Sequence, residues 1–346
     1  MHSLSTVQAV VTGRWPYEAP VHRAFVPFAV IALPLAIVPG WSGEERLALL
    51  GPDGRMTARA VMLDPDHPAR RRVGGLTFLG GVALDSPDPA FGGFSALNVE
   101  GDAFTLLSDG GNVVRFRMSG DWRPRDVRFS YLPSGPRTGW EKRDRDAESL
   151  AYDPATRRWW VGFESVNQIW RYSPGFAGAE RMAAPVLMRK WETGGGPESF
   201  VRLADGRFAA IAESPRKGRD WREGLVWAGD PTTTPPVVRF GYRPTPGYDP
   251  SDVTELPDGR LMVLERAFGL PFCWYARLVL MDRNALRSGR IGGGRTVARL
   301  APPLITDNYE GVAATREGRA TILWIVSDDN QLFLQRTLLL KFRLDR

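Results

Sequence analysis

The sequence contains few of the residues that carry common metal and nucleophile chemistry. Its 346 residues include one cysteine and three histidines, and no histidine follows His67. A single cysteine excludes an intrachain disulfide and a thiolate metal cluster. A Ser-His-Asp triad needs a histidine beside its nucleophile, and the chain also lacks a Gly-x-Ser-x-Gly elbow. A metal bound by most of this chain would therefore have oxygen ligands, which select calcium or magnesium over zinc or copper.

A basic patch is also missing. The net charge is +6, and only four of the 45 basic residues are lysine, but the sequence has no basic run and no aromatic-basic interleaving. A positive balance without such a patch does not indicate nucleic-acid binding. We therefore expect no nucleic-acid partner, and we expect the chain to be a monomer.

An uncharged apolar run covers residues 24–39. Its 16 residues are fewer than the roughly 20 that a membrane-spanning helix needs, and three of them are prolines. The run fits the apolar part of an export signal, with small residues for cleavage near Gly40. We expect residues 1–40 to be a leader that is cleaved or that anchors the chain, which places the protein in the periplasm or on the membrane facing it. The alternative is a buried strand or strand pair of the domain.

Residues 41–346 are expected to form one domain because they contain an evenly spaced repeat. Short apolar runs follow an opening polar residue and end at a closing acid. The openers are Ser95, Glu148, Glu198, Asp252 and Glu310, which are 53, 50, 54 and 58 residues apart. The closers are Asp109, Glu164, Glu213, Glu265 and Asp328. A period near 50 with short strands is typical of a β-propeller, so we predict an all-β fold.

Turn signals support antiparallel strands within each repeat. Asp-Gly pairs at 205–206 and 258–259, and similar links at 153–156 and 317–318, join the first two runs. Strand candidates at 47–50, 58–63 and 75–84 precede the first repeat, and one at 337–344 follows the last. Because a ring must close, we expect N-terminal strands to complete the blade that begins at Glu310. Five repeats are countable, and the extra strands allow five or six blades.

Propeller geometry predicts where the acids lie. The first strand of a blade lines the channel, and its start lies at the same face as the end of the second strand. Openers and closers should therefore meet at one rim, where each close like-charged pair costs roughly 4 kcal/mol. A cation or interleaved arginines must balance them. Arg266 follows a closing acid directly, so its guanidinium could balance the ring and hold a phosphate oxygen.

Several motifs together resemble the phytase-like family, whose proteins are also described as having esterase-like activity of phytase. They are Gly-Gly-Leu-Thr-Phe at 74–78, Pro-Glu-Ser at 197–199, Ala-Glu-Ser at 212–214, Leu-Glu-Arg at 264–266, Asp-Asn-Tyr-Glu-Gly at 307–311 and Ser-Asp-Asp-Asn at 327–330. The likeness covers about residues 70–345. It implies an often exported propeller. The Glu-Gly and Asp-Asn pairs are more distantly similar to those around the calcium of propeller lactonases and phosphotriesterases.

Two hypotheses of different class follow. The first is a metal-dependent hydrolase of small-molecule phosphate esters or other esters. In it calcium is held by Glu148, Glu198, Asp252, Glu310 and Asp328. Arg266 stabilises negative charge, and Glu213 and Glu265 join it as catalytic residues. The alternative is a non-catalytic propeller that binds a ligand or protein and carries a structural calcium, because propellers host both functions.

Overall fold

A computed structural model describes residues 46–141, 144–270 and 272–345. The leader expected at residues 1–40, with its apolar run at 24–39, lies outside these residues. The described chain is all-β: it contains 23 strands and four short 3₁₀ helices, and no α-helix. None of its helices is long and apolar enough to cross a membrane.

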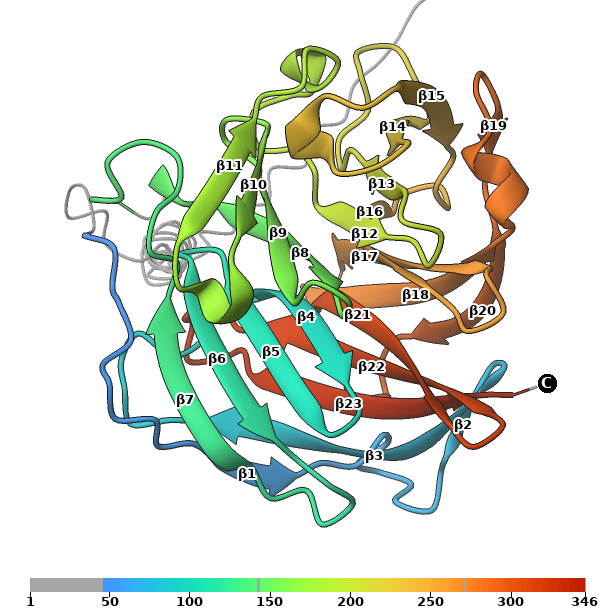
Figure 1. Ribbon diagram of the computed structural model, residues 1–346. Coiled ribbons are helices and arrows are strands. Elements are labelled where there is room, and N and C mark those ends of the chain that lie inside the picture. The colour runs from blue at the N-terminus through green and yellow to red at the C-terminus, as the bar shows by residue number, and fades with distance from the viewer. Residues whose placement is uncertain (1–45, 142–143, 271, 346) are drawn as a thin grey trace, which may run out of the picture. The chain divides into compact units, whose positions relative to one another are not determined.

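The strands form five sheets arranged as the blades of a propeller (Figure 1). Blade 1 comprises β4 (Phe94–Glu100), β5 (Ala103–Ser108), β6 (Asn112–Arg117) and β7 (Arg125–Tyr131). Blade 2 comprises β8 (Ala147–Asp153), β9 (Arg158–Phe163), β10 (Gln168–Tyr172) and β11 (Ala179–Ala183). Blade 3 comprises β12 (Ser199–Arg202), β13 (Phe208–Ile211), β14 (Arg222–Trp227) and β15 (Val237–Tyr242), and β19 (Ile291–Gly292) pairs in parallel with β15.

Blade 4 comprises β16 (Asp249–Glu255), β17 (Leu261–Gly269), β18 (Cys273–Met281) and β20 (Arg295–Leu300). Blade 5 comprises β21 (Asn308–Glu317), β22 (Ala320–Asp328), β23 (Thr337–Leu344), β3 (Leu76–Asp85) and β1 (Thr57–Ala60), with β2 (Arg72–Val73) paired to β3. The 3₁₀ helices are η2 (Pro174–Phe176), η3 (Met188–Lys190), η4 (Pro231–Thr233) and η5 (Arg283–Leu286).

The first strand of each blade lines the axis, as predicted. Strands β4, β8, β12, β16 and β21 each contact the next around a closed ring. The blade count is therefore five. The predicted hairpins are also present, since the Asp-Gly turns at 205–206 and 258–259 join β12 to β13 and β16 to β17. Gly206 and Gly259 adopt left-handed φ values of 87° and 82°, which glycine tolerates without a side-chain clash.

The ring closes through the N-terminal strands, which confirms the prediction for blade 5. Strand β3 pairs with β23 from Leu84 opposite Thr337 to Leu76 opposite Leu344. The prediction of a strand at 47–50 is wrong. These residues lie along blade 1, where the side chain of Asn112 accepts the Leu50 N–H at 3.0 Å and donates to the Ala48 carbonyl at 2.9 Å. A side chain thus satisfies the backbone groups that a strand partner would have satisfied.

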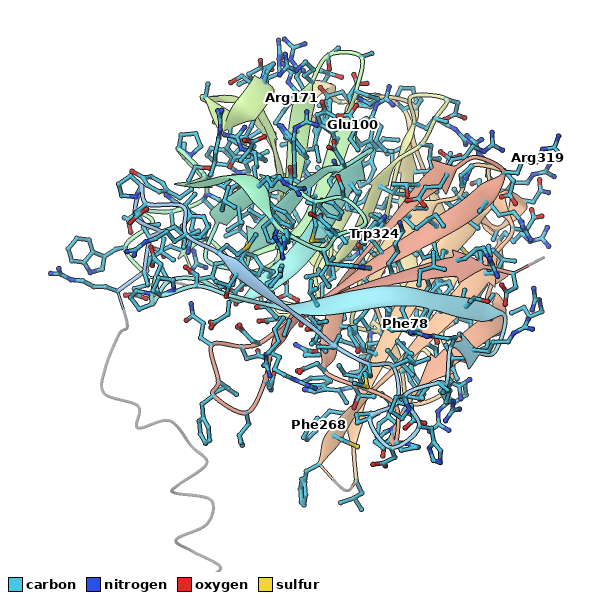
Figure 2. All side chains as sticks on the ribbon, turned by 90° about the horizontal axis from the view of Figure 1, so that it is seen from below. Phe78, Glu100, Arg171, Phe268, Arg319 and Trp324 are labelled. Atoms are coloured by element: carbon cyan, nitrogen blue, oxygen red, sulfur yellow. The ribbon has the colours of Figure 1, made fainter. Side chains whose placement is uncertain are left out.

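The two ends of the channel differ in their connections. At one end of the channel, the first (inner) strand of each blade begins and the second strand ends. At the other end lie the tight turns that join the first strand of each blade to the second. Figure 2 shows Glu100 and Arg319, at two of these turns, on the side of the molecule opposite Phe268, which lies on the β17–β18 hairpin.

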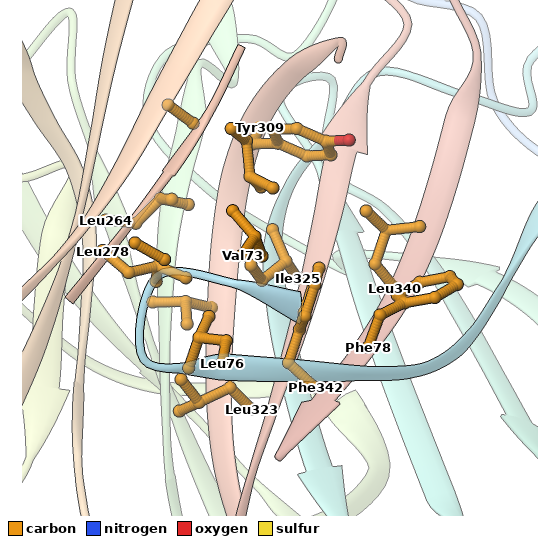
Figure 3. Packing of buried hydrophobic residues seen from close by; sticks show 14 of the residues in the cluster. Val73, Leu76, Phe78, Leu264, Leu278, Tyr309, Leu323, Ile325, Leu340 and Phe342 are labelled. Atoms are coloured by element: carbon orange, nitrogen blue, oxygen red, sulfur yellow. The ribbon is translucent and has the colours of Figure 1, made fainter. Parts of the chain in front are cut away.

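The core lies mainly between neighbouring blades. In one cluster, Leu264 and Leu278 of blade 4 pack against Tyr309, Ile325 and Phe342 of blade 5 (Figure 3). Burying a side chain of this size stabilises the fold by about 1.5–3 kcal/mol. These packed interfaces fix the positions of the inner strands and so of the residues at their ends.

Candidate functional site

Irregularities at the start of the inner strands present side chains to the axis. The antiparallel register of β8 with β9 skips Glu148, and that of β21 with β22 skips Glu310. Each is the extra residue of a β-bulge, a feature that redirects a side chain and is common beside functional sites. Glu164 and Glu213 follow the ends of the second strands β9 and β13. We call this end of the channel the acidic end.

Arg266 connects three blades at the acidic end. Its Nη1 lies 2.5 Å from Glu310 Oε1 and 2.9 Å from Asn308 Oδ1, both on β21. Its Nη2 lies 3.1 Å from Glu213 Oε1 and 3.4 Å from Glu198 Oε1, both in blade 3. The guanidinium is thus held by three carboxylates and an amide, and its side chain is only 16% exposed. Such charge-assisted contacts are strong when water is largely excluded.

Glu164 joins two further groups of carboxylates. Its carboxylate lies with those of Asp146 and Glu148 in one group, and with those of Glu198 and Glu213 in another. Within each group one oxygen per residue lies within 4.8 Å of the others. Asp146 also accepts the Ser165 N–H at 3.0 Å, and Glu164 accepts the Gly196 N–H at 3.2 Å. The cluster therefore spans blades 2 and 3 and reaches blades 4 and 5 through Arg266.

The five glutamates of the cluster have raised pKa values, so they are protonated more readily than free carboxyls. Burial raises the pKa of Glu164 to about 7, and the charges of Asp146 and Glu213 add to the effect. Burial also raises the pKa of Glu148 well above its usual range, reinforced by the charges of Glu310 and Glu198. The pKa values of Glu198, Glu213 and Glu310 are raised by burial although the guanidinium of Arg266 opposes the shift. One arginine does not offset this concentration of acids.

Six carboxyl groups gather around the guanidinium of Arg266 at the acidic end. They belong to Asp146, Glu148, Glu164, Glu198, Glu213 and Glu310. The charge of Asp109 also raises the pKa of Glu148 and of Glu310, and the charge of Asp249 raises that of Glu213. An arrangement of this kind can share protons, hold a cation, or do both.

A buried amide oxygen lies beside the acids. Asn167 is 9% exposed, and its Oδ1 has no hydrogen-bond partner, whereas its Nδ2 donates to the Trp191 carbonyl at 3.2 Å. A Cβ added at Gly196 would lie 2.6 Å from this Oδ1 and 3.0 Å from the Cγ of Glu164. Both side chains therefore pack against Gly196. An unpaired buried acceptor beside carboxylates is chemically suited to a hard cation.

Two residues expected at the rim are placed elsewhere. Asp252 accepts the backbone N–H groups of Val253 and Val312 at 2.7 and 2.8 Å, so each of its oxygens already has a donor. Glu265 is fully buried and accepts from the Tyr242 hydroxyl at 2.6 Å and from the Thr245 N–H at 3.0 Å. Both serve contacts between strands and blades.

The reason is a shift of one residue in blade 4. The bulge in β16 lies at Ser251, and Asp249 pairs with Arg266 while Pro250 pairs with Glu265. Arg266 thus occupies the place that Glu164 has beyond β9, and Glu265 the place of Phe163. Because successive side chains of a strand point to opposite faces, a one-residue shift turns Asp252 and Glu265 away from the axis.

Asp328 is buried at the end of β22, opposite Asn308, and its Oδ1 accepts the Asn330 N–H at 2.6 Å. Three residues that contribute to the acidic end were not predicted from the sequence: Asp146, Asn167 and Asn308. Asp146 lies two residues before an opener and outside the repeat, so spacing gave no signal for it. Asn308 lies in the Asp-Asn-Tyr-Glu-Gly motif, which did provide a signal.

A cavity of about 650 Å³ lies near the turn end of the channel, between blades 1 and 5. Its lining includes Trp122, Trp324, Asp102, Glu317 and Lys341. None of the clustered acids lines it. This hollow and the acidic cluster are therefore separate features.

Comparison with known proteins identifies a sequence family. Residues 89–331 match the family described as "Phytase-like: Esterase-like activity of phytase". No curated protein matches the sequence. Many solved structures are similar at low identity, and three of them illustrate the likeness. An α-L-arabinofuranosidase from Podospora anserina has a TM-score of 0.46 and 12% identity, over 87% of this chain and 98% of its own.

A glutaminyl cyclase from Myxococcus xanthus has a TM-score of 0.42 and 13% identity, over 73% of this chain and 91% of its own. The hydrazine synthase of Kuenenia stuttgartiensis has a TM-score of 0.35 and 14% identity, over 69% of this chain and 57% of its own. This chain therefore spans little more than half the length of the hydrazine synthase chain. At these scores the likenesses carry no conclusion about activity.

Proposed function

Because the chain belongs to the phytase-like family, we propose that it is a cation-dependent hydrolase of phosphate esters or other esters, acting at the acidic end of the channel. The observation that carries the proposal is the excess of buried carboxylates around Arg266. Like charges this close and this buried are costly unless a counter-charge is supplied. A divalent cation would supply it. We propose a small ester as the substrate and a monomer as the functional form.

The cation would be held by Glu164, Glu198 and Glu213, with the Asn167 amide oxygen beside Glu164. Glu148 belongs to the adjoining group with Asp146 and Glu164. Calcium fits this set because it accepts six to eight oxygen ligands in irregular geometry, whereas magnesium demands a near-ideal octahedron. Asp252 does not fit, since both of its oxygens accept backbone N–H groups. Glu310 and Asp328 remain part of the proposed site but lie outside the set that would hold the ion. When bound, such an ion would polarise the ester oxygen and lower the pKa of a bound water.

The chain's own residues supply the remaining chemistry. Arg266 fixes the carboxylates of Glu310 and Glu213 and is placed to stabilise negative charge on a reacting ester. The pKa of about 7 for Glu164 belongs to the cation-free protein, in which it can accept and return a proton near neutral pH. A bound cation would displace that proton, so Glu164 would then serve as a ligand. Glu213 stays in the proposed catalytic group. Glu265 is instead proposed to be structural, because its contacts are to Tyr242 and Thr245.

One observation favours the alternative of a binding propeller with a structural calcium. Both terminal nitrogens of Arg266 already contact carboxylates, which leaves the guanidinium less free to hold a substrate. In that case the cluster would rigidify the channel end and present a surface to a ligand. The two functions predict different results in an assay of turnover.

The test is hydrolysis of chromogenic phosphate and carboxylate esters by chelator-treated protein, with and without added calcium. The proposal predicts activity that is lost with chelator and restored by calcium. It also predicts that Glu164→Gln and Arg266→Lys lower kcat, and that Glu192→Gln, an exposed acid at the same end, does not. Calcium binding without turnover of any ester would support the binding propeller.

We also propose that residues 1–40 direct export, so that the domain acts in the periplasm or on the membrane facing it. The apolar run at 24–39 supports this. N-terminal sequencing of protein from the cell envelope should find a start near residue 40 or an intact anchor. Uncleaved protein confined to the cytosol would contradict it.

A further inference from the structure

The most exposed hydrophobic side chains gather at the acidic end. Among the described residues, the seven most exposed large hydrophobics are Trp140, Val186, Phe268, Leu270, Phe272, Phe333 and Leu334. Phe333 is 93% exposed and Phe272 is 79% exposed. A soluble surface tolerates isolated apolar residues, but a concentration at one end marks an interaction site.

The fold explains why these residues share one end. They lie in the 132–146 and 184–198 connections, which lead into inner strands, in the end of the β17–β18 hairpin, and in the β22–β23 loop, which follows a second strand. All four connections are at the end where inner strands begin. Figure 2 shows Phe268 at the edge of the molecule on this side, away from Glu100 and Arg319. The apolar residues therefore lie at the same end of the channel as the acidic cluster.

The two most apolar loops are held in shape. The β17–β18 hairpin continues three residue pairs past Arg266, and the rings of Phe268 and Trp274 lie 5.0 Å apart across it. In the β22–β23 loop, the Leu332 N–H donates to the Asp329 carbonyl at 2.8 Å, and the Gln335 N–H donates to the Leu332 carbonyl at 2.9 Å. These contacts stabilise the segments that carry Phe272 and Phe333.

Basic side chains accompany the apolar tips. In the loops 132–146, 184–198, 212–221 and 329–336, the described residues include six exposed cations: Arg137, Arg189, Lys190, Lys217, Arg219 and Arg336. The exposed acids of the same loops are Glu192 and Asp220. The acids of the cluster lie inward and are mostly buried, so the projecting surface is apolar and positive.

We propose that the acidic end docks on the surface of a lipid bilayer that contains anionic lipids. Separate apolar tips with cations between them match a membrane interface, where apolar groups enter the acyl boundary and cations meet anionic headgroups. Binding energy there scales with buried apolar area and with electrostatic attraction. The inference does not depend on hydrolysis, because it rests on the loop tips and their charges. It places the acidic cluster toward the membrane.

The test is sedimentation of the full chain with vesicles of phosphatidylcholine, with or without phosphatidylglycerol. Wild type should bind the anionic vesicles more tightly, and added salt should weaken that binding. The double variant Phe333→Ser, Leu334→Ser and the single variant Phe272→Ser should each lower the partition coefficient by at least about tenfold, given the apolar area removed from the interface. The double variant Lys190→Gln, Lys217→Gln should lose only the preference for anionic vesicles.

The matched control is Met182→Ser with Val238→Ser, which removes exposed apolar side chains from the outer strands β11 and β15. It should bind vesicles like wild type. The leader is identical in all variants, so a difference between them belongs to the loops. Loop variants that fold normally and bind vesicles as tightly as wild type would overturn the proposal. If they instead abolish self-association seen by light scattering without vesicles, the surface binds a second copy and the membrane proposal is wrong.

Discussion

The Nη1 of Arg266 lies 2.5 Å from Oε1 of Glu310, and this contact joins the end of β17 in blade 4 to the start of β21 in blade 5. The same guanidinium reaches Glu213 and Glu198 in blade 3. Arg266 is therefore the cation around which the inner ends of three blades are arranged. Because the acids around it outnumber it, the stability of this end of the channel should depend on pH and on added cations.

Replacing Arg266 with Gln should destabilise the metal-free protein. The change leaves buried carboxylates without their partner, and breaking a buried ion pair on one side costs about 3–5 kcal/mol. The loss should be smaller at about pH 5, where the carboxyls hold protons and carry less charge. Denaturant unfolding measures both values. Arg243→Gln, which breaks an exposed pair with Asp220, should change the free energy of unfolding by less than about 1 kcal/mol.

The stability of the metal-free protein should fall as pH rises from the mid-acidic range to neutrality. A carboxyl whose pKa is raised by folding binds its proton more tightly in the folded state, so deprotonation favours unfolding. For Glu164 the loss begins near pH 4.5 and is complete above its folded pKa of about 7. Melting temperatures across this range should decline, and Glu164→Gln should flatten the decline. A curve for Glu164→Gln that matches wild type would show that Glu164 is not a source of the slope.

Calcium should stabilise the folded protein, and more so at higher pH. At a free concentration about 100 times the dissociation constant, the gain in unfolding free energy is about 2.7 kcal/mol. Protons compete with the ion for the carboxylates, so the shift in melting temperature should shrink at about pH 5. Glu198→Gln should reduce the shift. An equal shift at both pH values would mean that calcium acts away from these acids.

Substitutions of Glu265 and Asp252, the two acids that lie away from the axis, should affect stability but not the response to calcium. Glu265→Gln weakens the contacts with the Tyr242 hydroxyl and the Thr245 N–H, so we expect a loss of about 1–2 kcal/mol in unfolding free energy. Its calcium-dependent shift in melting temperature should stay at the wild-type value. Asp252→Asn should behave in the same way. A calcium shift abolished by either change would return that residue to the cation site.

Much of the fold was predictable because it depends on turn residues and on the spacing of apolar runs, which can be seen in the sequence. The Asp-Gly turns fixed the hairpins at 205–206 and 258–259, and the period near 50 indicated a propeller. The closure of blade 5 by N-terminal strands was predictable because a ring of blades must be completed at the chain ends. The segment 47–50 was mistaken for a strand because its apolar residues match that pattern. The Asn112 side chain that satisfies its backbone is distant in sequence and could not be inferred.

The site was predictable only to within one residue in blade 4. In blade 4 the acids Asp252 and Glu265 match the repeat pattern of the other blades with a spacing of 13 residues. Ser251 and Arg266 are 15 residues apart, like Glu198 and Glu213, and this more regular spacing was a usable signal. The orientation of each side chain depends on β-bulges, which have no clear sequence signature here. Asp146 and Asn167 join the acids through tertiary packing alone.

The most direct test is calorimetric titration of calcium into chelator-treated protein near neutral pH. We expect saturable binding by wild type and binding at least about tenfold weaker in Glu198→Gln and in Glu164→Gln, because each removes a charged oxygen ligand. Glu265→Gln and Glu192→Gln should bind like wild type. Absence of calcium binding by wild type, or equal binding by all four variants, would contradict a cation site among these carboxylates.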